Sequence, residues 1–339
     1  MAIAEFTDFT RSVRDTYAES VSDGVLESNV IIQEIMRATG RPKEYDGIIA
    51  GPGGIWKNVK GSNFQWRVMK DELTAGNWGP GVGITPSTPE LLQNASLAMG
   101  GYQVSYFVDR WEQMKLGGPT EYVPLIRLYE KMAKRRWESL FEQRILGDDN
   151  SNDGWKGLAH FMAQSGTYAT NINLASDYAT PYRFNYTSSG QTFDVTCLDR
   201  FREVCNQATH GDSQDGSDSP NVAFTGRTDW QKMCAVIEDS NRNINVDTDR
   251  LKRGFKNFTW NGVPVFWSDR METDAIRKVY ILNTHHLGVA ITGNLMMESE
   301  TAQSITGSAI GTMAVSFHAG QPFCGNTKKQ GYIDNTNAS

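Results

Sequence analysis

Cysteine and long apolar runs are both scarce in this sequence. The four cysteines lack the paired spacing of a zinc site and the density of a disulfide scaffold; they are Cys197, Cys205, Cys234 and Cys324. Residues 1 to 20 carry acidic side chains and no apolar signal-peptide core, and no run approaches the ~18 apolar residues of a membrane-spanning helix. We therefore expect a soluble protein made in the cytosol, with a reduced interior and no membrane partner.

Positive charge is also in short supply. The 33 Lys and Arg residues are outnumbered by 39 Asp and Glu, which leaves a net charge of -6 and argues against a protein whose main task is to grip nucleic-acid phosphates. The one basic cluster, Lys131, Lys134, Arg135 and Arg136, is typical of a solvated helix face. The 39% hydrophobic and 21% charged content is that of a folded chain, and 339 residues suffice for two ordinary domains or one elaborated domain.

Catalytic motifs are missing as well. The sequence has no Walker P-loop and no serine-hydrolase elbow, and the glycines from Gly79 to Gly83 lack the strand and helix that a phosphate-binding loop requires. Asp247 and Asp249 are expected to be exposed turn residues, and no acid/base pair is evident. We predict that the protein is not an enzyme and has no catalytic or cofactor-binding residues.

Two weak metal signals favour ordinary structural roles. His285 and His286 are adjacent, so on a strand they would point to opposite sides and could not share an ion. A second signal matches positions one, three, five and six of a calcium loop at Asp149, Ser151, Asp153 and Gly154, but position twelve is His160 instead of the required Glu. A polar turn that ends a helix explains this stretch better, and we predict no metal site.

The longest regular pattern is a helix from about Tyr122 to Leu146, a rod of ~38 Å. Thr120 and Glu121 resemble a helix start, and turn-forming residues follow from Gly147 to Gly154. Side chains at helical spacing predict the buried stripe, which comprises Leu125, Leu128, Met132, the stem of Arg136 and Leu140.

A pair of strands precedes this helix. Period-two alternation predicts one strand around Phe64 to Val68 and another at Tyr102 to Val108. Between them, the stretch from Asp71 to Gly101 is rich in glycine and proline and is too long for an ordinary loop. We predict a projecting arm whose order comes from another molecule.

The two ends of the chain carry further elements. Phe6 to Val21 and Ser28 to Ala38 predict N-terminal helices, joined to the body by a link from Gly47 to Gly54. The far end predicts a strand with Met313, Val315 and Phe317 on one face, followed by a polar tail.

The second half of the chain alternates helices and strands. Phe161 to Phe193 is expected to be irregular with short strands, followed by a helix from about Val195 to Gly211 and an exposed acidic loop over Asp212 to Pro220. Next come a strand at Asn221 to Phe224, a helix capped by Thr228 or Asp229, and two strands within Lys278 to Thr292.

The clearest hairpin signal is Asn261-Gly262 between two apolar runs. Because proline cannot donate to a sheet ladder, Pro264 predicts that the second strand lies at an edge or bulge.

Nine tryptophans give the chain a large aromatic stock. Those in or beside the predicted arm are Trp56, Trp66, Trp78 and Trp111. They could stack on nucleic-acid bases or anchor a subunit interface. The negative net charge favours the interface.

A long helix ending in Ile145-Leu146-Gly147-Asp148, a polar turn and Gly157-Leu158, preceded by a projecting arm, resembles the spine helix and E-loop of tailed-phage major capsid proteins of the Hong Kong 97 type. The later order of helix, strand, helix, hairpin and strand pair resembles that family's axial domain. The resemblance implies an α+β fold. Its expected segments are an N-terminal arm (1–54), the E-loop and flanking strands (55–112), a peripheral domain with the spine helix (113–191), the axial domain (192–293), and a return strand with the tail (294–339).

The resemblance also implies a function and partners. Identical copies would assemble as hexamers and pentamers into an icosahedral virion shell around double-stranded DNA, with weak non-specific contact to it, in the host cytoplasm. Portal and decoration proteins would be further partners. The E-loop begins within about 60 residues of Met1, so the resemblance implies a separate scaffolding protein, unless the chain is already processed. An encapsulin-like cargo compartment and an enzyme of another family are the alternatives.

Overall fold

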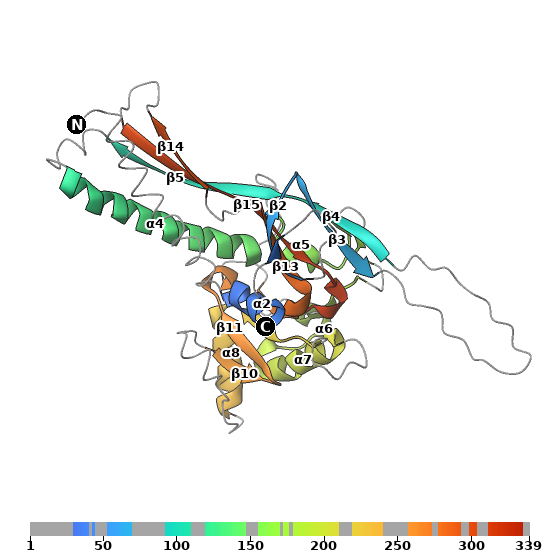
Figure 1. Ribbon diagram of the computed structural model, residues 1–339. Coiled ribbons are helices and arrows are strands. Elements are labelled where there is room, and N and C mark those ends of the chain that lie inside the picture. Colours follow the sequence, from blue (N-terminus) through green and yellow to red (C-terminus); the bar gives the residue numbers. More distant parts are fainter. Residues whose placement is uncertain are drawn as a thin grey trace, which may run out of the picture.

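The computed structural model describes the chain in thirteen stretches, which are residues 30–40, 43–44, 53–69, 92–109, 119–146, 155–169, 172–175, 179–209, 219–239, 257–272, 277–292, 298–303 and 311–334. Within them, two six-stranded sheets and one long helix set the shape (Figure 1). Two small two-stranded ribbons complete the strands of this part of the chain. The molecule is therefore of the α+β class, as predicted.

The first sheet is organised around its longest strand, β15. Residues 311–320 of β15 pair with β5, residues 312–317 also pair with β14, and residues 320–324 pair with β13. The strands in this sheet are β1 (Lys43–Glu44), β2 (Gly54–Val59), β5 (Gly100–Asp109), β13 (Leu287–Thr292), β14 (Glu298–Gln303) and β15 (Gly311–Cys324). The predicted strands at 102–108 and 313–317 are thus confirmed, as neighbours in one sheet.

The ribbon of β3 (Asn63–Met69) and β4 (Leu92–Ala98) corrects the predicted loop. Phe64, Trp66 and Val68 are buried and alternate with exposed residues, as the period of two predicted. Their partner is β4 and not β5, so residues 92–98 belong to a strand. The prediction of a loop from Asp71 to Gly101 was wrong there, because the buried side chains described in β4, Ala95 and Leu97, give too weak a pattern to mark a strand.

The long helix α4 (Pro119–Leu146) is confirmed, but its predicted buried stripe is wrong. Leu128 and Met132 are exposed, with 53% and 57% of their surface accessible. From residue 128 onward, the buried positions are Glu130, Ala133, Trp137, Phe141, Ile145 and, at the end of the helix, Leu146. This stripe is displaced by one residue, which is about 100° around a helix. It contains the aromatic residues, which bury the most apolar area, and the Trp137 ring lies 4.7 Å from the Tyr102 ring of β5.

The second sheet has the order β10-β11-β9-β12-β16-β8. These strands are β8 (Tyr182–Asn185), β9 (Val222–Thr225), β10 (Asn257–Trp260), β11 (Val263–Trp267), β12 (Lys278–Leu282) and β16 (Gly331–Asp334). Helices α7 (Phe193–Ala208) and α8 (Arg227–Asp239) contact it and each other. The helix at 195–211, the strand at 221–224 and the two strands within 278–292 are confirmed.

Alternate residues of the second sheet enter two different cores. Ala223, Val279 and Ile281 pack with α7 and α8, whereas Phe224 and Tyr280 join the larger core that also holds Trp137 and Phe141 of α4. Because both faces are covered, the strands read as continuous apolar runs instead of alternating ones.

The hairpin prediction is confirmed. Asn261 and Gly262 have φ of 51° and 79°, as a type I′ turn requires, and β10 pairs with β11 from Trp260↔Val263 onward. The edge or bulge expected from Pro264 is wrong, because β11 lies between β10 and β9. Pairing with β9 begins only at Val265, so the missing donor of Pro264 interrupts no ladder.

Two further predictions need correction. Helix α8 starts at Arg227, and the Glu272 carboxylate caps it by accepting hydrogen bonds from the Thr228 backbone N–H (3.0 Å) and hydroxyl, so neither Thr228 nor Asp229 is the cap. The predicted polar tail contains β16, whose four residues are all buried. Its short Gly-Tyr-Ile-Asp sequence gives too little periodicity to mark a strand.

The remaining described elements are short. Helix α2 (Val30–Thr39) ends at Gly40, with φ of 84°, as predicted for residues 28–38. Between α4 and α7 lie α5 (Leu158–Phe161), β6 (Thr167–Tyr168), β7 (Ile172–Asn173) and α6 (Tyr186–Ser189), which agrees with the expected irregular region. The 3₁₀ turns are η1 (Asp269–Glu272), η2 (Thr284–His286) and η3 (Thr327–Lys329).

Several predictions lie outside the described residues. They concern the N-terminal helix at 6–21, most of the link at 47–54, the arm tip at 71–91, the turn at 147–154, most of the acidic loop at 212–220, and residues Asp247 and Asp249. The division into five segments remains a prediction.

Candidate functional site

The histidines considered as metal ligands lie in separate places. His285 and His286 belong to the turn η2, so the strand assumed for them was wrong. His160 lies in α5, with its ring centroid 5.8 Å from that of Tyr168, while residues 149–154 lie outside the described part. Among the described residues, no three His, Cys, Asp or Glu side chains are grouped as metal ligands would be.

The cysteines are structural where the chain is described. Cys197, Cys205 and Cys324 are buried and Cys234 is half-buried, and none of the four forms a disulfide. Burial raises the pKa of Cys205 and Cys324 to about 12. Both therefore stay protonated at neutral pH, which makes them poor nucleophiles.

The tryptophans split into different roles. Trp66 is fully buried, with its ring 5.3 Å from Phe323 and 5.9 Å from Tyr168, so it is a core residue and the interface role expected for it was wrong. Trp56 is half-buried, with the Lys43 ammonium 5.6 Å from its ring centroid. Trp78 and Trp111 lie outside the described residues.

One side of α4 exposes apolar side chains. Among the described residues, the large hydrophobic side chains classed as exposed are Leu128 and Met132, one helical turn apart. Their exposure is unusual because the sheet β5-β15-β14 runs along the same helix (Figure 1) and the neighbouring stripe of α4 is fully packed.

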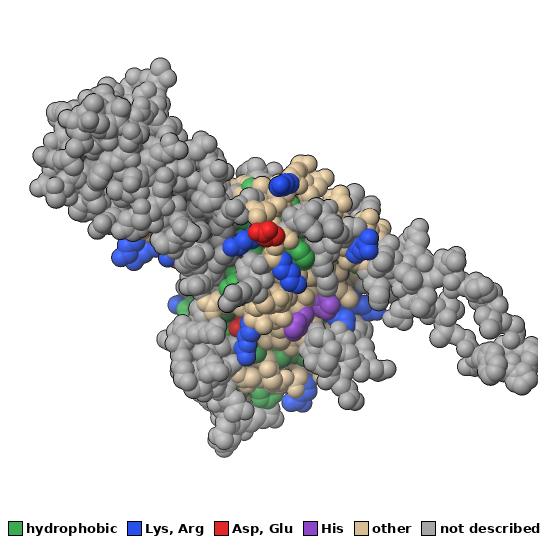
Figure 2. Space-filling model, viewed as in Figure 1, with side chains coloured by type: hydrophobic (Ala, Val, Ile, Leu, Met, Phe, Trp, Pro, Cys, Tyr) green, Lys and Arg blue, Asp and Glu red, His purple; other side chains and the backbone are tan. Residues whose placement is uncertain are grey.

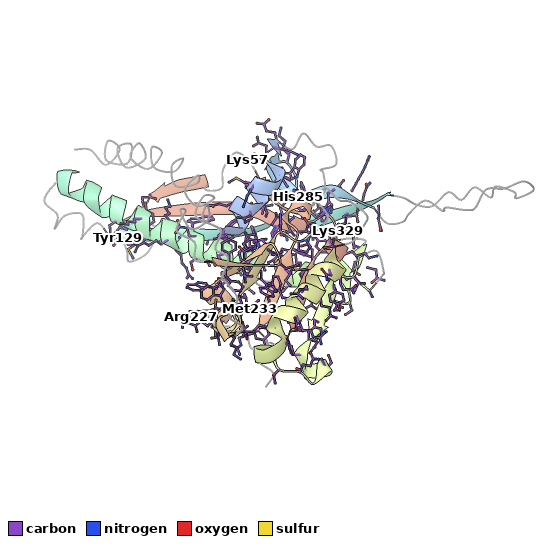
Figure 3. All side chains as sticks on the ribbon, turned by 90° about the horizontal axis from the view of Figure 1, so that it is seen from below. Lys57, Tyr129, Arg227, Met233, His285 and Lys329 are labelled. Carbon is purple, nitrogen blue, oxygen red and sulfur yellow. The ribbon has the colours of Figure 1, made fainter. Side chains whose placement is uncertain are left out.

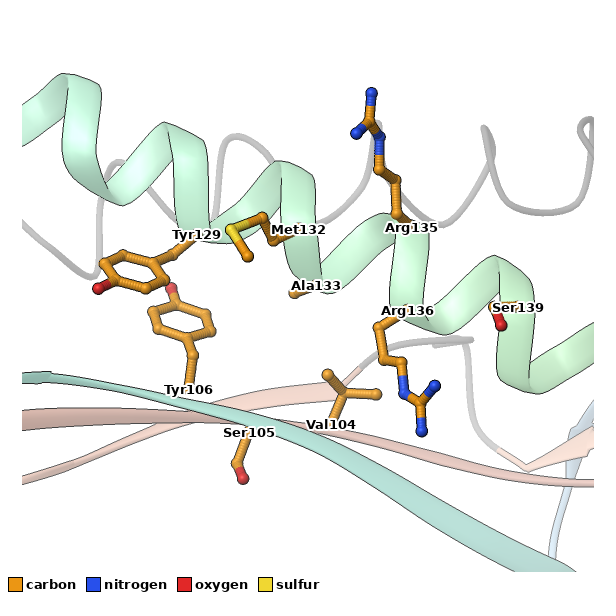
Figure 4. Close-up of a pocket in the computed structure, with 9 residues that line it drawn as sticks. All are labelled: Val104, Ser105, Tyr106, Tyr129, Met132, Ala133, Arg135, Arg136 and Ser139. Atoms are coloured by element: carbon orange, nitrogen blue, oxygen red, sulfur yellow. The ribbon is translucent and has the colours of Figure 1, made fainter.

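A cleft of about 580 Å³ opens between α4 and β5 beside Met132. Its lining residues are Val104, Ser105, Tyr106, Tyr129, Met132, Ala133, Arg135, Arg136 and Ser139. The Tyr106 and Tyr129 rings stack with centroids 5.6 Å apart and planes within 4° of parallel. Figure 4 shows this pair closing one end of the cleft, while the Arg136 side chain points toward β5 and Arg135 points away.

One polar contact connects the two walls of the cleft. The Tyr106 hydroxyl donates a hydrogen bond to Glu130, whose side chain is 8% exposed. The rim is cationic, because the lining residues Arg135 and Arg136 are exposed. Elsewhere on the face in Figure 2, Lys and Arg side chains are scattered and form no continuous stripe.

This composition suits association more than chemistry. Tyr, Met and Arg are the residue types enriched at protein interfaces. The described part of the site brings together no nucleophile with a base and no pair of carboxylates, which reaction centres require. We call Leu128, Met132 and the cleft beside them the α4 face.

The sequence pattern of α4 predicted the wrong buried stripe, but the residues of that stripe include Leu128 and Met132 of the α4 face. Both stripes are apolar, and the stripe led by Leu128 and Met132 was assigned to the core. The signal that separates them is the size of the side chains, since the stripe with Trp137 and Phe141 buries more area. A helix that packs on one sheet needs a single apolar stripe, so a second apolar stripe in the sequence indicates a face that the subunit itself does not cover.

None of the helices described is both long and apolar enough to cross a membrane.

Comparison with solved structures identifies the fold. The chain is similar to the capsid protein of cyanophage A-1(L), with a TM-score of 0.62 and 14% identity over 83% of this chain and 90% of that one. It is similar to the encapsulin of the holo-SrpI complex from Synechococcus elongatus PCC 7942 (TM-score 0.53, 12% identity, 91% and 95% covered) and to the capsid protein of Myoviridae phage XM1 (0.51, 10%, 85% and 90%). The chain thus has the Hong Kong 97-type fold, as predicted.

Comparisons by sequence add no relative. No protein-family model matches the chain. No curated protein matches it either.

Proposed function

We propose that this protein is a major capsid protein, whose identical copies associate into the closed head shell of a tailed bacteriophage. The observation that carries the proposal is the fold, since the chain aligns over most of its length with shell-forming proteins, and the TM-score with the cyanophage A-1(L) capsid protein, 0.62, exceeds the 0.53 with the encapsulin. A protein built only to associate also accounts for the lack of a reaction centre in the described residues.

The α4 face is the surface that we assign to contact between copies. An apolar pair that costs free energy in water is stabilised when a neighbour covers it, at about 25 cal/mol per Å² of apolar area. The Tyr106 and Tyr129 rings and the cationic rim add the residue types that dominate interface energies. Each copy would repeat the same contact.

The finer parts of the proposal concern partners. Copies would group as hexamers and pentamers, build the shell in the host cytoplasm with a separate scaffolding protein, and join a portal and decoration proteins. The enclosed double-stranded DNA would be held by confinement, since the net charge is -6. The five segments, from the N-terminal arm (1–54) to the return strand and tail (294–339), would serve these contacts.

An encapsulin-like compartment is the second candidate, because an encapsulin shares the fold at a TM-score of 0.53. The contents of purified particles separate the two. Nuclease-protected DNA in particles from infected cells supports the capsid, whereas a co-purifying cargo protein supports the compartment.

The test of the α4 face is the double substitution Leu128→Ser with Met132→Ser. Both side chains are exposed in the subunit, so we expect the free energy of unfolding to change by less than about 0.5 kcal/mol. Each anchor contributes at least about 1 kcal/mol per contact, so the yield of shells should fall by tenfold or more. Denaturant melts of unassembled protein and sedimentation with electron microscopy measure the two effects.

A matched control is Gln143→Ser, an exposed polar position on the same helix, which should leave both quantities unchanged. If the double variant formed shells at normal yield, the α4 face would not be part of the contact between copies. A wild-type protein that stays monomeric at high concentration with its assembly partners would overturn the capsid function itself.

A further inference from the structure

Two of the connections between the two sheets are short, and each consists of one 3₁₀ turn. Strand β12 of the second sheet leads through η2 to β13 of the first, and β15 of the first leads through η3 to β16 of the second. Each turn is capped by an asparagine, Asn283 or Asn326, whose side chain accepts a backbone N–H inside the turn. Figure 3 shows the turns near one another, marked by His285 and Lys329.

One side chain ties the two crossings together. The Gln330 amide accepts a hydrogen bond from the Asn283 N–H (2.8 Å) and donates one to the Asn283 carbonyl (3.1 Å). Both residues are fully buried. A third bond, from the Gly325 N–H to the His286 carbonyl (2.8 Å), joins the same two segments through their backbones.

Helix α2 is attached to the same place. The hydroxyl of buried Thr284 accepts from Asn221 Nδ2 at 2.8 Å and lies 3.3 Å from the Glu34 carbonyl of α2. The Asn221 side chain also accepts from the Thr284 N–H at 3.1 Å. The first turn therefore contacts α2 on one side and Gln330 on the other.

The lead-in to β8 is held there too. The Thr327 hydroxyl donates to the Ala179 carbonyl, and the Tyr182 N–H donates to the Gln330 carbonyl at 3.1 Å. Segments from five distant parts of the chain thus meet in one polar cluster.

Directional bonds in a dry interior specify geometry in a way that apolar packing does not. Hydrophobic burial depends on area and tolerates sliding, whereas a buried amide that loses its partners remains unsatisfied. Buried polar networks that are fully paired make one arrangement unique. Sheets joined only by the shared apolar core would lack this constraint.

We propose that the Asn283–Gln330 pair is a lock that fixes the angle between the two sheets, and that Thr284 couples helix α2 to this lock. It is a conformational device that gives every copy one shape. The inference does not require the function proposed above, because the angle is a property of the single subunit.

The test replaces Gln330 with methionine, which keeps the length of the side chain and removes both hydrogen bonds. Spin labels at Lys60→Cys beside β2 and Gln231→Cys on α8, both exposed positions, report the distance between the sheets. A Cys234→Ser background removes the half-buried thiol, and dilution with unlabelled protein suppresses signals between copies. We expect the distance distribution of Gln330→Met to be at least twice as wide as that of the parent.

The matched control is Gln321→Met. Gln321 is equally buried and donates one hydrogen bond to the Lys156 carbonyl (3.2 Å), but it lies within the first sheet and not at a crossing. Its distribution should stay as narrow as that of the parent. Equal widths in the Gln330→Met protein and the parent, or equal broadening in both variants, would overturn the lock.

Thr284→Val provides a second test, which can be carried out even if the Gln330→Met protein does not fold. It keeps the shape and removes the hydroxyl near the Glu34 carbonyl. Amide hydrogen exchange in α2 should accelerate by up to about tenfold, the loss expected for one buried hydrogen bond. Exchange in β10, which is remote from the junction in the sheet order, should not change. Unchanged amide exchange in α2 would show that Thr284 does not couple this helix to the Asn283–Gln330 pair.

Discussion

The two helical layers of this molecule treat their apolar residues differently. On the second sheet, Cys197, Phe201 and Val204 of α7 face one core and are all buried. On the first sheet, α4 has a buried stripe and, beside it, the exposed pair Leu128 and Met132. Both helices lie on sheets, yet in the described residues only the layer with α4 leaves large hydrophobic side chains exposed.

The contrast separates residues that stabilise the subunit from residues available to a neighbour. A helix whose apolar side chains form one stripe is satisfied by its own sheet. A helix with two such stripes has to be covered on a second side, because an exposed apolar patch is unfavourable in water. The α7 layer should therefore control folding, and the α4 face should control association.

The largest effect expected from this contrast is on folding. Phe201→Ala removes a fully buried ring from the α7 core, and the loss of burial plus the cavity should cost about 3 to 5 kcal/mol. Met132→Ala, at a position 57% exposed, should cost less than about 0.5 kcal/mol. Denaturant unfolding of the unassembled subunit measures both values.

The contrast between the α7 core and the α4 face would be wrong if Met132→Ala lost more stability than Phe201→Ala. A loss above about 2 kcal/mol for Met132→Ala would mean that the subunit itself covers this side chain. Phe141→Ala, from the buried stripe of the same helix, is the positive control and should resemble Phe201→Ala.

A smaller effect is expected where the second sheet holds α8. Glu272 caps the helix through the Thr228 N–H, and Arg277 lies 3.5 Å from buried Asp229 and 3.8 Å from Glu272. Glu272→Ala removes the cap and should cost about 1 to 2 kcal/mol. Gln231→Ala, an exposed position on the same helix, is the control and should change the melting temperature little.

The charge on Glu272 also predicts a pH dependence. Burial alone would raise the pKa of this carboxyl, but the hydrogen bonds from Thr228 and the charges of Arg277 and Arg227 lower it below its usual value. A depressed pKa contributes stability above the unfolded value of about 4.3 and loses it as pH falls through the folded value. Glu272→Gln should thus differ from wild type most above about pH 5, with the difference shrinking at lower pH; a gap that widens on acidification would contradict the cap.

Much of this fold could be predicted from strong local patterns. The hairpin turn Asn261-Gly262 and the helix predicted from about Val195 to Gly211 were identified because short-range geometry and side-chain periodicity decide them. Strand β4 was missed because its apolar pattern is weak, and β16 was missed because its place depends on partners distant in sequence. Nothing in Gly331 to Asp334 itself reveals that β12 and β8 lie on either side.

The candidate site was harder to predict for a related reason. Periodicity finds apolar stripes but does not say which of two stripes the sheet covers, so Leu128 and Met132 were assigned to the core. The junction around Asn283 and Gln330 left no sequence signal, because single polar residues in short turns look like ordinary surface. Only their tertiary contacts distinguish Asn283 and Gln330 from polar residues at the surface.

The smallest predicted effect compares one kind of contact in the two layers. Tyr106 donates to Glu130 on the α4 side, and Tyr182 donates to Glu203 at 2.9 Å on the α7 side. Tyr106→Phe keeps the stacked ring and should cost about 1 kcal/mol, because it removes one hydrogen bond to Glu130, a residue only 8% exposed. Paired denaturant melts of the two Tyr→Phe variants measure the difference.

Tyr182→Phe should cost less than about 0.5 kcal/mol, since the Glu203 side chain is 33% exposed and keeps its ion pair with Arg200. Each variant removes one tyrosine hydroxyl, so a difference between their changes in the free energy of unfolding reports how far water is excluded from each contact. If Tyr106→Phe proved as mild as Tyr182→Phe, water would reach Glu130, and the buried stripe of α4 would be less tightly sealed against β5 than its burial indicates. If it lowered stability as predicted while shells still formed, the hydroxyl would serve to seat α4 on its own sheet, and contact between copies would depend on Leu128 and Met132.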